Sequence, residues 1–157
     1  MAITVPIEPE VLEKTQSVPQ APDFSPRTYL GRHVLAEFFE CDSNVLNNPE
    51  LVEKYMVEAA LECGATIVQK CFHLFAPHGV SGVIIISESH LAIHTWPELG
   101  YAAVDLFTCG DACDPKVAYE YLKKCFRSED ANFKQLNRGI LDDKNLNVEH
   151  TPFCIAQ

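Results

Sequence analysis

Residues 80–109 read VSGVIIISESHLAIHTWPELGYAAVDLFTC. Segments rich in β-branched and aromatic residues predict strands at Val80–Ser87, His90–Trp96 and Tyr101–Cys109. The first segment is apolar almost throughout, which favours a central position in a sheet. Only short turns separate the three segments, and strands joined by short turns must pair antiparallel. The run therefore predicts an antiparallel sheet.

Elements on both sides of this run complete the predicted domain. Pro49 follows two asparagines, and Asn before a Pro at the first helical position is typical of a helix start. Gly64 predicts the end of that helix. Asp114 before Pro115 predicts a second helix, which runs to about Arg127. The remaining predicted elements are strands at Arg32–Phe39, Ala65–Phe75 and around Asn132–Asn137.

Both predicted helices are amphipathic, with apolar residues at helical spacing along one face. Two such helices must cover one face of the sheet, which predicts an α+β fold. We expect a two-layer sandwich of a mostly antiparallel sheet with two helices on one face, and the other face either wet or buried against a partner. The residues expected to point inward are Leu51, Val52, Tyr55, Met56, Ala59, Ala60 and Cys63 in the first helix, and Val117, Ala118, Tyr121, Leu122 and Cys125 in the second.

The chain divides into an extension at residues 1–28 and one folded domain at residues 29–157. Five of the ten prolines fall in the extension. Proline removes backbone donors and restricts the residue before it, so a continuous strand or helix is not expected there. A short helical turn around Glu8–Gln16 is the one local element that the extension suggests.

Composition narrows the class of protein. The formal charge of −10 argues against nucleic-acid binding, which needs a basic surface. The sequence has no apolar run of membrane-spanning length and no secretory signal at its start. Seven scattered cysteines without a CxxC pair indicate neither a zinc site nor a disulfide framework. Reduced thiols in a cytoplasmic protein are the simplest interpretation.

The segment Ser87–His90 places four polar residues directly after the apolar run, which indicates a sharp turn or a site. In the strand that follows, alternation places His90, His94 and Trp96 on one face. A polar sheet face with hydrogen-bonded histidines is one explanation. A zinc site at the two histidines would need further ligands, and a serine-hydrolase elbow would need a GxSxG motif, which is absent.

The segments GRHVLAEFFECD, from Gly31, and SGVIIISESHLAIHTWPELGYAAVDLFTCGD, from Ser81 to Asp111, resemble the short prokaryotic class of S-adenosylmethionine decarboxylase proenzymes. The resemblance extends from Gly31 to about Arg127 and is weak beyond Ser128. It implies that the chain cuts itself between Glu88 and Ser89. Ser89 would then become a covalent pyruvoyl group, which is the cofactor of this family.

The resemblance also assigns roles to other residues. His94 would be the proton acceptor in processing, and Ser81 would assist it. Cys109 would be the proton donor in catalysis, after a Schiff base between the pyruvoyl group and the substrate amine has lost carbon dioxide. Phe75, Trp96 and Glu98 would bind the nucleoside substrate. No metal is implied, and the family pairs its protomers as homodimers of cleaved chains.

Two alternatives remain open at this point. Some relatives decarboxylate L-ornithine or L-arginine with the same cofactor, also for polyamine synthesis. A non-catalytic regulatory subunit is a third possibility, but such a chain should lack the cleavage serine or the proton donor. Because Ser89, His94 and Cys109 are all present, the leading hypothesis is a decarboxylase that acts on S-adenosylmethionine for spermidine synthesis.

Overall fold

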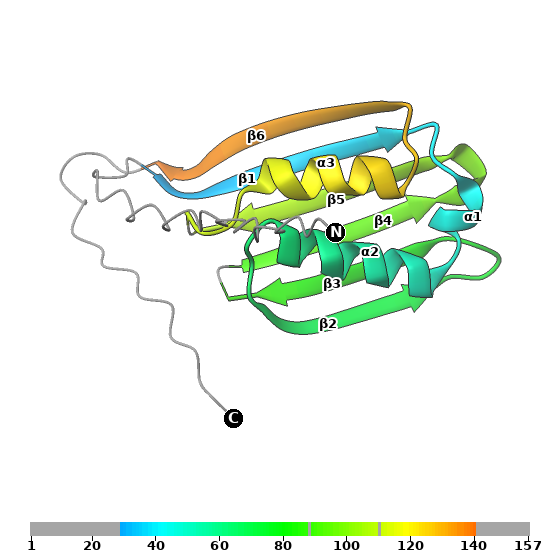
Figure 1. Ribbon diagram of the computed structural model, residues 1–157, viewed down its shortest axis with the longest axis horizontal. Coiled ribbons are helices and arrows are strands. Elements are labelled where there is room, and N and C mark those ends of the chain that lie inside the picture. Colours follow the sequence, from blue (N-terminus) through cyan, green and yellow to red (C-terminus); the bar gives the residue numbers. More distant parts are fainter. Residues whose placement is uncertain (1–28, 88, 110, 141–157) are drawn as a thin grey trace, which may run out of the picture.

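The computed structural model describes residues 29–87, 89–109 and 111–140. In this part of the chain, six strands form one antiparallel sheet in the order β2-β3-β4-β5-β1-β6. Figure 1 shows that α2 and α3 cross the same side of this sheet. The two-layer α+β prediction is therefore confirmed. The elements are β1 (Tyr29–Phe39), α1 (Ser43–Leu46), α2 (Pro49–Glu62), β2 (Ile67–Leu74), β3 (Val80–Ile86), β4 (Ser89–Trp96), the 3-10 helix η1 (Pro97–Leu99), β5 (Tyr101–Thr108), α3 (Pro115–Cys125) and β6 (Asp130–Ile140).

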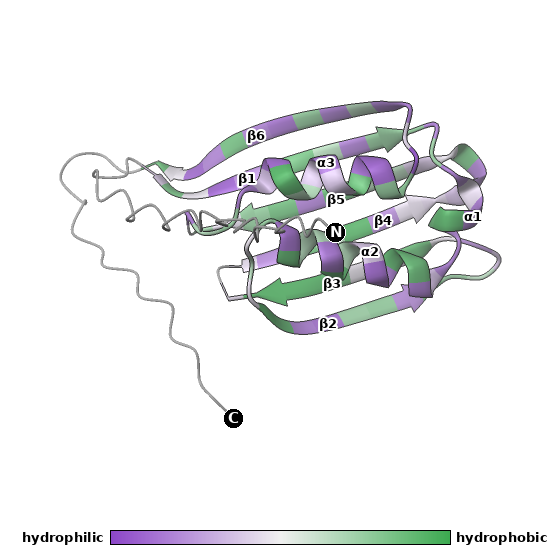
Figure 2. Ribbon diagram, viewed as in Figure 1, coloured by the Kyte–Doolittle hydropathy of each residue, from purple (hydrophilic) through white to green (hydrophobic). Residues whose placement is uncertain are grey.

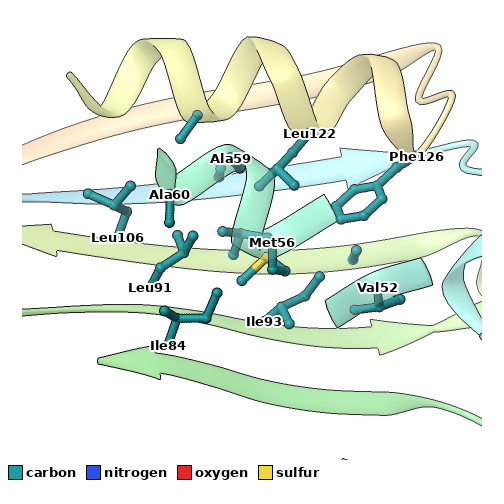
Figure 3. Close-up of a cluster of buried hydrophobic side chains, with 14 of the residues drawn as sticks. Val52, Met56, Ala59, Ala60, Ile84, Leu91, Ile93, Leu106, Leu122 and Phe126 are labelled. Atoms are coloured by element: carbon teal, nitrogen blue, oxygen red, sulfur yellow. The ribbon is translucent and has the colours of Figure 1, made fainter. Parts of the chain in front are cut away.

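The hydrophobic core lies between the two long helices and the sheet. Met56 of α2 is fully buried, as are Ile84 of β3 and Ile93 of β4. Figure 3 shows these side chains together with Leu122 of α3 and Phe126, which follows α3. Removal of this apolar surface from water is the main stabilising contribution to the fold.

Both long helices begin at the predicted residues. The side-chain oxygen of Asn48 accepts a hydrogen bond of 3.0 Å from the backbone N–H of Leu51. Asp114 accepts one of the same length from the backbone N–H of Lys116. These bonds satisfy backbone donors that the first turn of a helix leaves without a partner. The single turn α1 was not predicted, because four residues are too few to show a helical period.

One inward-facing assignment is wrong. Val117 of α3 is 40% exposed, whereas Ala118 and Leu122 are buried. The buried face of the helix is centred on these two residues, and this turns Val117 away from the sheet. Tyr121, on the same side as Val117, is half-buried and donates a hydrogen bond of 2.7 Å to Glu58 of α2.

The opposite face of the sheet carries no helix within the described residues (Figure 1). Alternation along β4 is as predicted, because Leu91 and Ile93 are buried under the helices while His94 and Trp96 are exposed. Figure 2 shows β3 as largely hydrophobic and β6 as an alternation of hydrophilic and hydrophobic residues. None of the described helices is long and apolar enough to span a membrane. We refer to the helix-free side as the open face.

Candidate active site

Ser89 and Cys109 lie together at one end of the sheet. Ser89 is the first residue of β4, and it pairs in register with Thr108 of β5. Cys109 follows Thr108 directly, so it stands at the same end of the neighbouring strand. Both side chains are half-buried. In Figure 1 this end is the left edge of the sheet, where β3 turns into β4. Glu88 lies outside the described residues.

The Ser89 hydroxyl contacts a histidine to which the resemblance assigned no role. The Oγ atom of Ser89 lies 3.3 Å from Nδ1 of His90. This distance is within reach of a weak hydrogen bond, in which the hydroxyl donates if Nδ1 carries no proton. The structure therefore places an imidazole beside the predicted nucleophile within the same chain.

His90 belongs to a group of aromatic and charged side chains on the open face. Its ring centroid lies 6.4 Å from that of His33 and 6.2 Å from that of Phe107. Nη1 of Arg138 lies 2.9 Å from Nδ1 of His33, and since arginine only donates, this Nδ1 accepts. Nε2 of His33 then carries the proton and lies 3.6 Å from the Asp105 carboxylate, too far for a hydrogen bond.

Sequence reasoning missed this group because its members come from four strands. His33 pairs in register with Phe107 of β5 and with Leu136 of β6. Contacts between residues so far apart in the chain leave no local spacing signal. The available signal was the alternation within each strand, which predicts the face of a residue but not its neighbours.

Ser81 and His94 form a second pair further along the sheet. Ser81 of β3 is in register with His94 of β4, and its Oγ lies 2.7 Å from Nδ1 of His94. The Trp96 ring centroid is 6.4 Å from that of His94. Trp96 in turn packs against Tyr101, at 5.3 Å between centroids. Burial and a hydrogen bond to Glu37 raise the pKa of Tyr101 to about 12, so its hydroxyl stays protonated.

The structure does not bring His94 to Ser89 within one chain. The two residues are five positions apart on β4. A strand rises about 3.3 Å per residue, so they are separated by roughly 16 Å. Within one chain, Ser89 therefore lies at one end of the sheet, whereas His94 and its partner Ser81 lie further along it.

The three predicted substrate-binding residues lie at the end opposite Ser89. Trp96 closes β4, Glu98 follows in η1, and Phe75 follows β2. Phe75 is 49% exposed, and its ring packs against His73 with centroids 4.7 Å apart. Glu98 lies 3.1 Å from Nε2 of His78.

A surface cavity of about 700 Å³ opens at this end of the molecule. Glu98 and His78 form part of its wall, and the remainder comes from Leu74, Pro97, the first turns of α1 and α2 and the two asparagines between these helices. Hydrogen-bond acceptors and amide groups in such a cavity can bind the hydroxyl groups of a polar ligand.

No metal site is built into the described part of the chain, where no group of three or more His, Cys, Asp and Glu side chains is placed to hold an ion. A covalent group formed from Ser89, as the resemblance implies, would need no such ligands.

Comparison with known proteins gives consistent matches. The family model described as S-adenosylmethionine decarboxylase matches residues 32–139. The S-adenosylmethionine decarboxylase proenzyme of Fervidobacterium nodosum is 59% identical over 114 residues, covering 73% of this chain and 83% of the relative. The proenzyme of Thermotoga maritima is 57% identical over the same length, covering 73% and 88%.

A solved structure agrees with these matches. The crystal structure of the adenosylmethionine decarboxylase from Aquifex aeolicus superposes with a TM-score of 0.69 at 31% sequence identity. The superposition covers 74% of this chain and 97% of the other. The domain described here therefore corresponds to nearly the whole of that protein.

Proposed function

The chain belongs to the S-adenosylmethionine decarboxylase family, and from this membership we propose that it decarboxylates S-adenosylmethionine with a pyruvoyl group made from its own Ser89. The observation that carries the proposal is the placement of Ser89 beside Cys109, at the start of β4 and the end of β5. One residue would supply the cofactor and the other the proton that completes the reaction.

Cofactor formation begins with an attack by Ser89 Oγ on the carbonyl carbon of Glu88. The peptide nitrogen leaves as the Ser89 amine, so the peptide bond becomes an ester. Removal of the Ser89 α-proton then expels the Glu88 carboxylate, and hydrolysis of the remaining enamine releases ammonia. His90, at 3.3 Å from the hydroxyl, is placed to accept its proton during the attack.

The α-proton needs a second base, which we assign to His94. Because this residue is roughly 16 Å from Ser89 along β4, it must act on another copy of the chain. We therefore propose that Ser89 is processed by His94 of the partner subunit, and that Ser81 of the partner subunit orients that imidazole through the 2.7 Å contact seen within each chain.

A two-fold dimer through the open face would supply this arrangement. None of the described helices covers this face, and it carries exposed apolar side chains, among them Ile85 at 43% and Trp96 at 41% exposure. If the two sheets stack face to face about a two-fold axis perpendicular to the strands, the strands of the two chains run in opposite directions. The Ser89 end of one sheet then lies against the His94 end of the other. A stable dimer should bury more than about 1,000 Å² in total.

The same antiparallel stacking of the two sheets would also assemble the substrate-binding residues. Phe75 and Trp96 offer aromatic faces for an adenine ring, and Glu98 offers a carboxylate to the ribose hydroxyls. All three lie at the His94 end, so the partner would bring them to Ser89 together with His94. The dimer would then have two identical sites. In each site, one chain would supply the cofactor and the other chain the substrate-binding residues.

The pyruvoyl carbonyl supplies an electron sink for the pair of electrons released when carbon dioxide leaves. The chain itself must then return one proton to the substrate α-carbon. Cys109 is a candidate for this step, because it follows Thr108, the register partner of Ser89, and its thiol can act as a proton donor.

Release of labelled carbon dioxide tests the substrate. The purified protein, given carboxyl-labelled S-adenosylmethionine, L-ornithine or L-arginine in parallel, should release label from the first alone. The Ser89→Ala variant is the matched control and should release none. Release from ornithine or arginine alone would contradict the assignment, and light scattering that shows a monomer at micromolar concentration would contradict the dimer.

A further inference from the structure

Two buried cysteines that have no part in the proposed reaction lie in contact. The Sγ atoms of Cys63 and Cys113 are 2.9 Å apart. Cys63 is 4% exposed and caps the C-terminus of α2, and Cys113 is fully buried and precedes the capping residue of α3. The pair thus joins two segments that are 50 residues apart in the sequence.

The backbone around this pair is held on both sides. The N–H of Asp114 donates a hydrogen bond of 2.9 Å to the carbonyl of Cys63. Nη2 of Arg32 donates one of 3.0 Å to the carbonyl of Cys113. At Gly64 a Cβ would lie only 2.5 Å from the carbonyl oxygen of Ala112, so this turn packs directly on the segment before α3. A disulfide bond of about 2.05 Å needs the two sulfurs to approach by only roughly 1 Å.

The chemistry of the pair favours a disulfide over a metal. A structural zinc ion takes four ligands, and the described residues contain no cluster of three or more metal-binding side chains. The hydrogen bond with Cys113 is the largest influence on Cys63 and lowers the pKa of its thiol. A lowered pKa raises the fraction of thiolate, which is the nucleophile in thiol–disulfide exchange.

We propose that Cys63 and Cys113 form a disulfide that covalently joins the two fragments produced by self-cleavage. The oxidant is a small-molecule disulfide such as oxidised glutathione. The Cys63 thiolate attacks it and releases one small thiol, and the Cys113 thiolate then attacks the Cys63 sulfur and releases the second. Two protein thiols and one small disulfide thus become one protein disulfide and two small thiols, so atoms and electrons balance.

The position of the bond gives it a structural consequence. The proposed cleavage would place Cys63 in the fragment of residues 1–88 and Cys113 in the fragment of residues 89–157. The joining of two fragments therefore rests on the proposed function. Cys113 is also four positions beyond Cys109. The bond would therefore fix the segment that carries the proton donor to the end of α2, on the other fragment.

Denaturing gel electrophoresis without reductant tests the bond. The full chain is equilibrated in glutathione buffers of increasing oxidised fraction, blocked with an alkylating agent and run with and without reductant. In oxidising buffer we expect one band near 17.5 kDa that separates into two fragments on reduction. The Cys63→Ser and Cys113→Ser variants should give two fragments in every lane. Cys125→Ser, which removes a half-buried cysteine of the same fragment as Cys113, should behave as the wild type.

Peptide mapping of the unreduced wild type identifies the bonded pair without any variant. A peptide that links residues 63 and 113 supports the proposal. Two fragments without reductant in every buffer, or a linked band that persists in Cys63→Ser, would overturn it. A reduced sample that remains a single full-length band means that self-cleavage has failed instead. In that case the linked peptide, and a whole-chain mass lower by two hydrogen atoms, still decide whether the disulfide forms.

Discussion

Ser81 and His94 face each other across β3 and β4 with 2.7 Å between Oγ and Nδ1, at a distance along the sheet from Ser89 that no side chain can bridge. Cys109, in contrast, stands beside Ser89 at the end of the neighbouring strand. The groups proposed to make the cofactor and those proposed to use it are thus divided between the two ends of one sheet. Because of this division, co-expression of two variant chains can test directly whether a second chain takes part in processing.

Complementation between two inactive variants tests whether His94 acts across the dimer. Ser89→Ala lacks the nucleophile and His94→Ala lacks the base, so neither should cleave efficiently when expressed alone. When they are co-expressed with different tags, the His94→Ala chain should be cleaved, because its Ser89 meets His94 of the partner subunit. Intact-mass analysis of each tagged chain gives the result. If the His94→Ala chain stays whole in isolated mixed dimers, the base acts elsewhere.

Replacement of Cys109 by alanine should separate processing from turnover. We expect the chain to be cleaved, since Ser89 and His94 remain. Turnover should fall by about 10²–10⁴-fold, the usual contribution of a positioned general acid. Without the thiol, protonation at the cofactor carbon instead of the substrate should convert the new N-terminus to alanine during turnover. A variant that is cleaved, fully active and unchanged in fragment mass would make Cys109 a packing residue only.

His90 should contribute to the rate of self-cleavage. Its Nδ1 lies 3.3 Å from the Ser89 hydroxyl, so His90→Ala removes a proton acceptor in contact with that hydroxyl. We expect cleavage to slow by roughly 10–100-fold, below the usual contribution of a positioned general base because the contact is long. The half-time of cleavage after synthesis, followed by gel, measures this. Tyr121→Phe is a suitable control, since Tyr121 belongs to α3 and bonds Glu58 of α2, on the opposite side of the sheet from His90, and equal half-times for both variants would argue against the role.

Stability should depend strongly on the contact between α2 and the sheet. Met56 is fully buried, and Met→Ala in a core typically lowers the free energy of unfolding by about 2–5 kcal/mol. Urea unfolding is best measured on the uncleaved Ser89→Ala background at one protein concentration, so that neither fragment separation nor dimerisation changes the reference state. Leu99→Ala, at a residue 70% exposed, should change the free energy by less than about 0.5 kcal/mol. Equal values for the two variants would contradict the assigned core.

Much of the fold was predictable because its signals are local. The caps at Asn48 and Asp114 mark where α2 and α3 begin, and alternation fixes which side chains of β4 face the helices. The last strand was the least predictable element. β6 runs over Asp130–Ile140, longer than the predicted segment, and most of its side chains are exposed. Two consecutive polar residues, Lys134 and Gln135, interrupt its alternation of polar and apolar residues and weaken the strand signal, although the family match continues through it to residue 139.

The sequence proposes residues for the site but not their arrangement. A motif identifies Ser89, His94 and Cys109 without showing how far apart a strand holds them. The neighbours of Ser89 depend on strand order, since β1 lies between β5 and β6 and brings His33 towards His90. That order is decided by packing between distant segments, for which a single sequence carries no local pattern.

Intact-mass spectrometry of the purified wild-type protein under reducing conditions tests the central claim most directly. Cleavage with cofactor formation predicts two masses. One corresponds to residues 1–88, and the other corresponds to residues 89–157 with the mass of one ammonia missing, because the Ser89 nitrogen has been lost. Treatment with an amine and a hydride reductant should shift only the second mass, since a ketone is present there. A wild-type chain that remains whole after prolonged incubation, or a second fragment that keeps an unmodified serine at its N-terminus, would contradict the account.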